Sequence, residues 1–143
     1  DRRDGGRRAA VRRAAAMPID ITVPPAAGRQ IVERYGGGGF IISGVRWKGS
    51  VLILPNRTLG WPVSEAGAIE PAALGPVLAA EPRPRILVVG CGRGFAPRAE
   101  ELDAAMREAG IGVEWMNTGA ACRTYNVLVL EDRDVAAALI AID

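Results

Sequence analysis

Hydrophobic and polar positions in the first half of the chain predict short strands. Apolar residues alternate or run together between glycine and proline clusters at residues 18–25, 40–43 and 50–54, a pattern typical of strands bounded by turns. The glycines of 36–39 favour a flexible turn, because glycine loses more backbone entropy than any other residue in a regular element. Residues 44–49 are predicted to connect two strands. We therefore expect an antiparallel β-meander in this half.

The second half alternates between strand and helix patterns. The apolar run at 86–89 predicts a buried strand, and 97–109 has the apolar stripe of an amphipathic helix. Residues 111–116 follow as a strand, expected to be parallel to the first because the intervening helix acts as a crossover. Residues 71–80 predict a kinked or two-part helix, since a proline interrupts the pattern. Periodicity alone leaves 120–142 open between helix and strand.

Length and composition indicate one globular domain. The chain has 143 residues, of which 49% are hydrophobic and 24% charged, and no apolar run approaches the roughly 20 residues that span a bilayer. We expect a soluble protein without a membrane span. Residues 1–16 hold six arginines and two aspartates, which predicts a disordered basic tail or a non-native upstream extension. Residues 17–143 form the expected α/β domain and hold 12 basic and 14 acidic side chains, a balance that argues against nucleic-acid binding.

The residue types limit the possible chemistry. The sequence contains no histidine, which excludes histidine-based catalytic triads and histidine ligands to a metal. Its two cysteines cannot form a metal site by themselves. We expect no catalytic residue, no metal and no cofactor. Two isolated cysteines favour buried thiols in a reducing cytoplasm, and the abundance of alanine and arginine suggests a bacterial source.

A glycine-rich turn after the strand at 86–89 is the first candidate site. Gly90, Gly92 and Gly94 could bring backbone amides close to a phosphate or to S-adenosylmethionine. Too few residues follow for a full dinucleotide fold, and the next helix begins with acidic residues that oppose a bound anion. A tight structural turn is the favoured interpretation.

A polar segment beyond the strand at 111–116 is the second candidate. Thr118 is predicted to cap the following helix. Cys122 could have a lowered pKa and act as a nucleophile, although no histidine can serve as its base. We expect this segment and the glycine turn to meet at one sheet edge. The candidate pocket residues are Gly90, Gly92, Gly94, Thr118, Cys122, Thr124, Tyr125 and Asn126.

Two tryptophans beside predicted turns are candidate anchors for a partner. Trp47 and Trp61 are large apolar side chains in a chain that is only 5% aromatic. Exposed positions would suit a protein interface, whereas packing in the core is an equally good interpretation.

Two sequence blocks resemble a known family. YGGGGFIISGVRWKGSVLILP at 35–55 and TGAACRTYN at 118–126 are similar to the small domain of the mitochondrial complex I assembly factor 3 family, which has bacterial, archaeal and animal adipogenesis-associated members. The resemblance implies a three-layer α/β domain whose central mixed sheet of about five strands is preceded by the β-meander. It also implies a helix near 119–131 and an antiparallel last strand at 135–141. Many relatives have threonine where this chain has Cys91.

The resemblance implies protein binding and no enzymatic activity. We expect a non-enzymatic protein-interaction or assembly factor, with a role in respiratory complex I biogenesis, whose partners are other proteins and which could form homo-oligomers. One alternative is a small-ligand or nucleotide-binding protein that uses the 90–94 turn and the 118–126 segment. Another is a thiol enzyme that uses Cys122.

Overall fold

The computed structural model describes residues 28–94 and 99–143. The predictions for the basic tail, the segment at 18–25 and the helix start at Pro97 lie outside them. The strands are β1 (Val32–Gly36), β2 (Gly39–Ile42), β3 (Val45–Lys48), β4 (Val51–Leu54), β5 (Arg57–Gly60), β6 (Ile86–Gly90), β7 (Gly112–Met116) and β8 (Val135–Leu139), and the helical segments are η1 (Ala66–Ala68), η2 (Pro71–Leu74), α1 (Gly75–Leu78), α2 (Glu100–Glu108) and α3 (Thr118–Leu130).

Strands β1, β2 and β3 form an antiparallel three-stranded sheet, which confirms a meander in the first half. The strand predicted at 50–54 is β4, which belongs to the larger sheet instead. The glycine turn is shorter than predicted, because only Gly37 and Gly38 lie between the strands, with φ of +62° and +83°. The segment 44–49, predicted as a connection, contains strand β3 instead. Ser43 and Gly44 both have positive φ, and a two-residue turn of this kind reverses the chain tightly enough for the next residues to pair at once.

The larger sheet has the order β5-β4-β8-β6-β7. Strand β6 is parallel to β7, as expected, and also to β8. The last strand, β8, is antiparallel to β4 on its other side. The predicted central mixed sheet of five strands is therefore confirmed, and β8 lies at its centre because β4 and β6 pair with its two edges.

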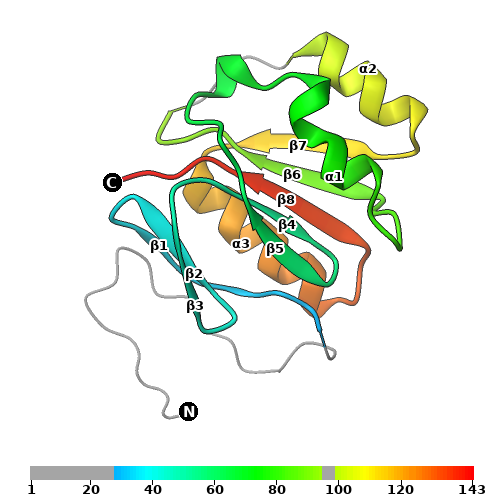
Figure 1. Ribbon diagram of the computed structural model, residues 1–143. Helices are drawn as coiled ribbons and strands as arrows, with labels where there is room; N and C mark the ends of the chain where they lie inside the picture. The colour runs from blue at the N-terminus through cyan, green and yellow to red at the C-terminus, as the bar shows by residue number, and fades with distance from the viewer. Residues whose placement is uncertain (1–27, 95–98) are drawn as a thin grey trace.

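Helices cover both faces of this sheet, giving three layers (Figure 1). Alternate residues of the central strands point to opposite faces: Leu87 and Val89 pack in a first core cluster, and Val88 between them packs in a second cluster on the other face. The first core cluster also contains Leu52, Leu54, Trp61, Leu74, Val77, Leu102 and Met106, and the second contains Phe40, Ile42, Val51, Ile53, Ala121, Cys122, Tyr125, Val129 and Leu139.

The helices break and end where the sequence predicts. The first is divided into η2 and α1, which confirms the expected two-part helix. Gly110, two residues beyond α2, has a φ of +83°, the left-handed conformation predicted for a helix stop. Helix α3 and strand β8 settle the ambiguous end of the chain as the resemblance implied. Among the residues that the structure describes, no helix is long and apolar enough to cross a membrane.

Candidate functional site

The glycine turn lies at the carboxyl end of β6, and two of its amides are already hydrogen-bonded. The Cys91 amide donates to the Met116 carbonyl at 2.8 Å, and the Gly92 amide donates to Thr118 Oγ1 at 2.9 Å. A phosphate-binding loop needs such amides to face the ligand. These two hydrogen bonds instead join the end of β6 to the end of β7 and the start of α3.

Thr118 joins three segments at this edge of the sheet. Its hydroxyl is buried and donates to the Ile140 carbonyl at 2.7 Å, and its amide donates to the Gly92 carbonyl at 2.8 Å. The prediction that Thr118 caps α3 is wrong. Asn117 is the N-cap, since its Oδ1 accepts from the Ala120 amide at 2.8 Å and its backbone is extended. Thr118 lies one residue into the helix, where its hydroxyl satisfies buried backbone groups of the sheet instead.

Gly90 allows α3 to approach β6 closely. A Cβ at this position would lie 3.0 Å from Thr118 Cα and 3.1 Å from Leu139 Cδ2. Gly94 is exposed and has no atom within 4 Å of the corresponding Cβ position. The two glycines therefore differ in role, because packing requires glycine only at the first.

Cys122 does not have the properties of a nucleophile. The side chain is fully buried in the second core cluster, and burial raises the pKa of its thiol to about 12. A lowered pKa was the basis of the thiol-enzyme hypothesis, and the structure contradicts it, because the apolar surroundings disfavour a thiolate. Cys91 packs against the first core cluster, and no disulfide joins the two cysteines.

Tyr125 and Asn126 of α3 form hydrogen bonds with strand β1 and with the residues just before it. Tyr125 donates its hydroxyl hydrogen to the Gln30 carbonyl at 2.8 Å, and burial raises its pKa. Asn126 Oδ1 accepts from the Val32 amide at 3.0 Å, and its Nδ2 donates to the Val32 carbonyl at 2.8 Å. Thr124, on the same helix, is half-buried and takes part in none of these side-chain contacts.

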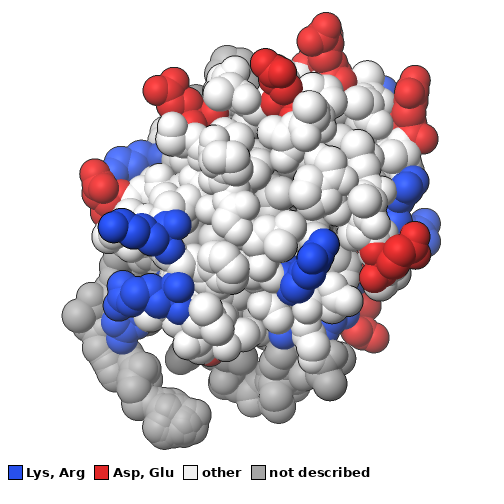
Figure 2. Space-filling view, in the orientation of Figure 1, with Lys and Arg blue, Asp and Glu red and all other residues white. Residues whose placement is uncertain are grey.

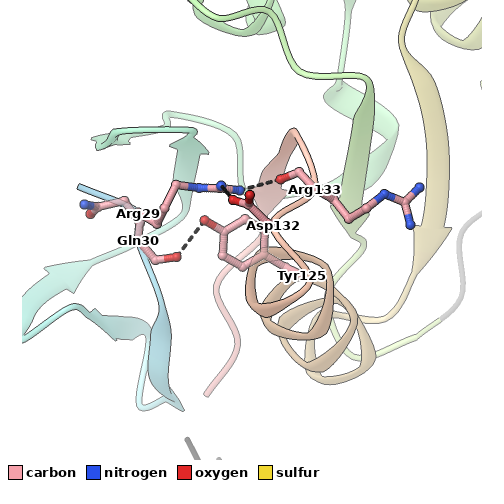
Figure 3. Close-up of polar contacts among 5 residues, drawn as sticks. All are labelled: Arg29, Gln30, Tyr125, Asp132 and Arg133. Carbon is pink, nitrogen blue, oxygen red and sulfur yellow. Dashed lines mark hydrogen bonds and ion pairs between the residues drawn. The ribbon is translucent and has the colours of Figure 1, made fainter. Parts of the chain in front are cut away.

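Arg29 reinforces this attachment next to Tyr125 (Figure 3). Its guanidinium pairs with Asp132 Oδ1 at 3.2 Å and donates to the Arg133 carbonyl just beyond α3. Tyr125 and Asn126, which the sequence suggested for a pocket, thus hold β1 against α3. Sequence reasoning missed Arg29, because its partner lies 103 positions away along the chain.

A shallow groove of about 560 Å³ opens beside the glycine turn. Gly92 is the predicted site residue that lines it, and the adjacent Arg93 supplies a cation whose guanidinium donates to the Asp143 carbonyl at 2.6 Å. Ser64 and Glu65 were missed, because they come from the connection after β5, which has no motif of its own. The groove is lined by Gly38, Ser64, Glu65, Ala66, Cys91, Gly92, Arg93, Ile140, Ala141, Ile142 and Asp143.

The two candidate anchors differ. Trp61 is 5% exposed, and its indole N–H donates to the Ala73 carbonyl at 2.9 Å. Its proposed role as an exposed anchor is therefore wrong, and the core interpretation is confirmed. Trp47 is half-buried on β3, where it packs against the second core cluster. Within residues 28–94 and 99–143, no three His, Cys, Asp or Glu side chains are grouped so that they could hold a metal ion.

The fold is that of solved Mth938-like proteins. A Bordetella pertussis protein described as a Mth938-like domain superposes with a TM-score of 0.72 at 26% identity, over 86% of this chain and 92% of that one. A Bartonella henselae protein described as an outer membrane protein gives a TM-score of 0.75 at 34% identity, over 81% and 98%. The architecture therefore defines the class as a small Mth938-like α/β domain.

The family model described as "Protein of unknown function (DUF498/DUF598)" matches residues 32–140. The chain belongs to this family. It is 40% identical over 113 residues to the Xenopus tropicalis NADH dehydrogenase [ubiquinone] 1 alpha subcomplex assembly factor 3, covering 76% of this chain and 60% of the relative.

Two further relatives extend the comparison. The human protein of the same name is 36% identical, over 85% of this chain and 66% of its own length. An uncharacterised Rhodobacter capsulatus protein is 32% identical, over 82% and 89%. The predicted resemblance is confirmed, and the chain spans about 60% of the length of the first assembly factors that it matches.

Proposed function

We propose that this chain is a non-catalytic protein-binding domain that acts in the assembly of respiratory complex I. The observation behind the proposal is its 36% to 40% identity to proteins named as complex I assembly factors, over 76% to 85% of its length. Its partners are other proteins, and it acts in the cytoplasm. The family model matches residues 32–140, which include both sheets and all three α-helices, and this supports a shared binding role.

The use of the polar side chains supports a non-catalytic role. The side chains of Thr118, Tyr125 and Asn126 each form hydrogen bonds with backbone atoms of neighbouring segments. Cys122 is buried as a thiol, and the sequence has no histidine to serve as a base. These groups stabilise the domain, so its outer surface is what remains for contact with other molecules.

Deletion of the gene in its native host tests the proposal. We expect membranes from the deletion strain to lose NADH:ubiquinone reductase activity and to accumulate partial assemblies on native gels, and we expect the intact chain to restore both. A control chain with Gly90→Ala, which weakens the fold, should restore less. A deletion strain with fully assembled and active complex I would contradict the proposal.

The groove beside Gly92 supports a second candidate function, the binding of a small ligand. Its volume of about 560 Å³ could hold a small molecule, and Arg93 provides a positive charge. A ligand present at 100 times its Kd stabilises a protein by about 2.7 kcal/mol. Thermal unfolding with S-adenosylmethionine and common nucleotides tests this alternative, and no shift with any of them would count against it.

A further inference from the structure

Strand β3 is an open edge of the three-stranded sheet. In the described part of the chain it pairs with β2 alone. The Gly49 amide donates to the Gly38 carbonyl at 2.7 Å, and hydrogen-bonded pairs recur at every second residue of an antiparallel ladder. The backbone groups of Val45 and Trp47 therefore face β2. Those of Arg46 and Lys48 face away from it, toward the open edge.

The side chains of β3 alternate between basic and apolar. Arg46 and Lys48 are exposed and project from the same face of the sheet, because they are two residues apart. Val45, which is 55% exposed, and the half-buried Trp47 project from the other face. Arg46 pairs across the sheet with Ile41, which pairs in turn with Arg34 of β1, so basic side chains of the two outer strands lie on the same face, on either side of Ile41.

The charge of this region differs from that of the helical layer. Figure 2 shows basic side chains gathered over the part of the molecule where Figure 1 places β1, β2 and β3, whereas several acidic side chains line the upper edge, where α2 lies. Glu33 lies next to β3, since its Oε1 accepts from the Gly44 amide at 3.2 Å. A segment that docks on this sheet meets mainly positive charge.

We propose that the open edge of β3 receives an extended segment of a partner protein, in which acidic residues alternate with apolar ones. The outward amides and carbonyls require a β-strand as the occupant. The basic side chains select acids on one face of that strand, and Val45 and Trp47 select apolar residues on the other. The inference rests on the proposed protein-binding function and names the surface and the kind of partner.

A second copy of this chain suits the edge poorly. Two β3 strands paired antiparallel about Trp47 would place Arg46 of each copy opposite Lys48 of the other. Like charges that lie directly opposite destabilise a strand pair, and basic residues on edge strands protect proteins from self-association in this way. The same charges attract an acidic strand.

In the proposed complex the partner strand is antiparallel to β3, and this orientation specifies which of its backbone atoms are used. In an antiparallel pair, the residues opposite Arg46 and Lys48 exchange backbone hydrogen bonds with them and project from the same face. The acidic residues of the partner therefore both neutralise the basic side chains and provide the pairing amides. The amides of its apolar residues point away from β3.

The probe is a blocked octapeptide of alternating glutamate and valine, added to the full-length protein. We expect it to slow the hydrogen exchange of the Arg46 and Lys48 amides and to bind about tenfold more tightly than the same peptide with lysine in place of glutamate. N-methylation of the glutamate amides should abolish this protection. N-methylation of the valine amides, the matched control, should leave it intact.

Protein variants separate charge from backbone pairing. The double change Arg46→Glu and Lys48→Glu should reverse the preference in favour of the lysine peptide. Arg46→Pro removes an outward amide without breaking the β2–β3 ladder and should weaken binding more than Arg46→Gln, which removes only the charge.

Three outcomes would overturn the inference. The first is that the glutamate peptide fails to protect the β3 amides, and the second is that both N-methylated peptides bind equally. The third is that these amides are already protected in a dimer of the protein alone, which would identify a second copy as the occupant. If the gene deletion still impairs complex I, any of these results refutes the β3 edge as the binding surface but does not contradict the proposed assembly function.

Discussion

Asn126 of α3 occupies both backbone hydrogen-bonding groups of Val32 at the start of β1, accepting from its amide at 3.0 Å and donating to its carbonyl at 2.8 Å. A carboxamide has the same donor and acceptor pair as a peptide group. The side chain therefore takes the place of a neighbouring strand. It joins the three-stranded sheet to the helix that covers the larger one.

Replacement of Asn126 should be costly. Asn126→Ala leaves a buried amide and a buried carbonyl without partners, so we expect a loss of about 2–4 kcal/mol in the free energy of unfolding. Thr124→Ala on the same helix is the matched control and should change stability by less than about 0.5 kcal/mol. Urea denaturation measures both, and equal effects of the two substitutions would show that the Val32 contact contributes little.

The phenol of Tyr125 should make stability depend on alkaline pH. Burial raises its pKa above the ordinary value of 10.0, so the folded state favours the protonated phenol. This contribution is present below about pH 10 and is lost as the pH rises further, by up to about 1.4 kcal/mol per pH unit. Tyr125→Phe should cost about 1 kcal/mol near neutrality, since it loses the hydrogen bond to Gln30.

The wild-type protein and Tyr125→Phe should therefore converge in stability above about pH 10. Chemical denaturation at a series of alkaline pH values checks this, and Cys122, whose pKa is also raised, is present in both proteins. Parallel stability curves over the whole range would contradict the assigned environment of Tyr125.

The two cysteines should differ in their reaction with a thiol reagent. Cys91 is half-buried beside the groove, whereas Cys122 has no exposed surface and a pKa of about 12. We expect one thiol to react with a chromogenic disulfide reagent in the native protein near about pH 8, and the second to react only after unfolding. Cys91→Ser should abolish the native reaction. Rapid native labelling of Cys122 would revive the thiol-enzyme hypothesis.

Gly90 and Gly94 should respond differently to alanine. Gly90→Ala forces a methyl group to within 3.0 Å of the Thr118 backbone, and overpacking of this kind costs about 1–3 kcal/mol. Gly94→Ala meets open space and should be close to neutral. Thermal unfolding compares the two. If Gly94→Ala proved the more harmful, the turn would have a role beyond packing.

Local patterns predicted most of the elements. The apolar run at 86–89, the stripe at 97–109 and the two-part helix after Pro71 depend on interactions between near neighbours in the chain, and short-range periodicity records these. The strand Val45–Lys48 was missed, because it is short and exposed and its four residues have no apolar run of their own. Its pairing with β2 depends on the preceding two-residue turn.

The sequence by itself determined an α/β domain with a glycine turn after a buried strand, because composition and periodicity are properties of the chain. Only the tertiary structure decided what the polar residues do. Thr118, Tyr125 and Asn126 bond to backbone groups 22 to 95 positions away, and Cys122 has its pKa set by burial. Partners and burial of this kind depend on which segments fold against one another, so no local pattern could have assigned these roles.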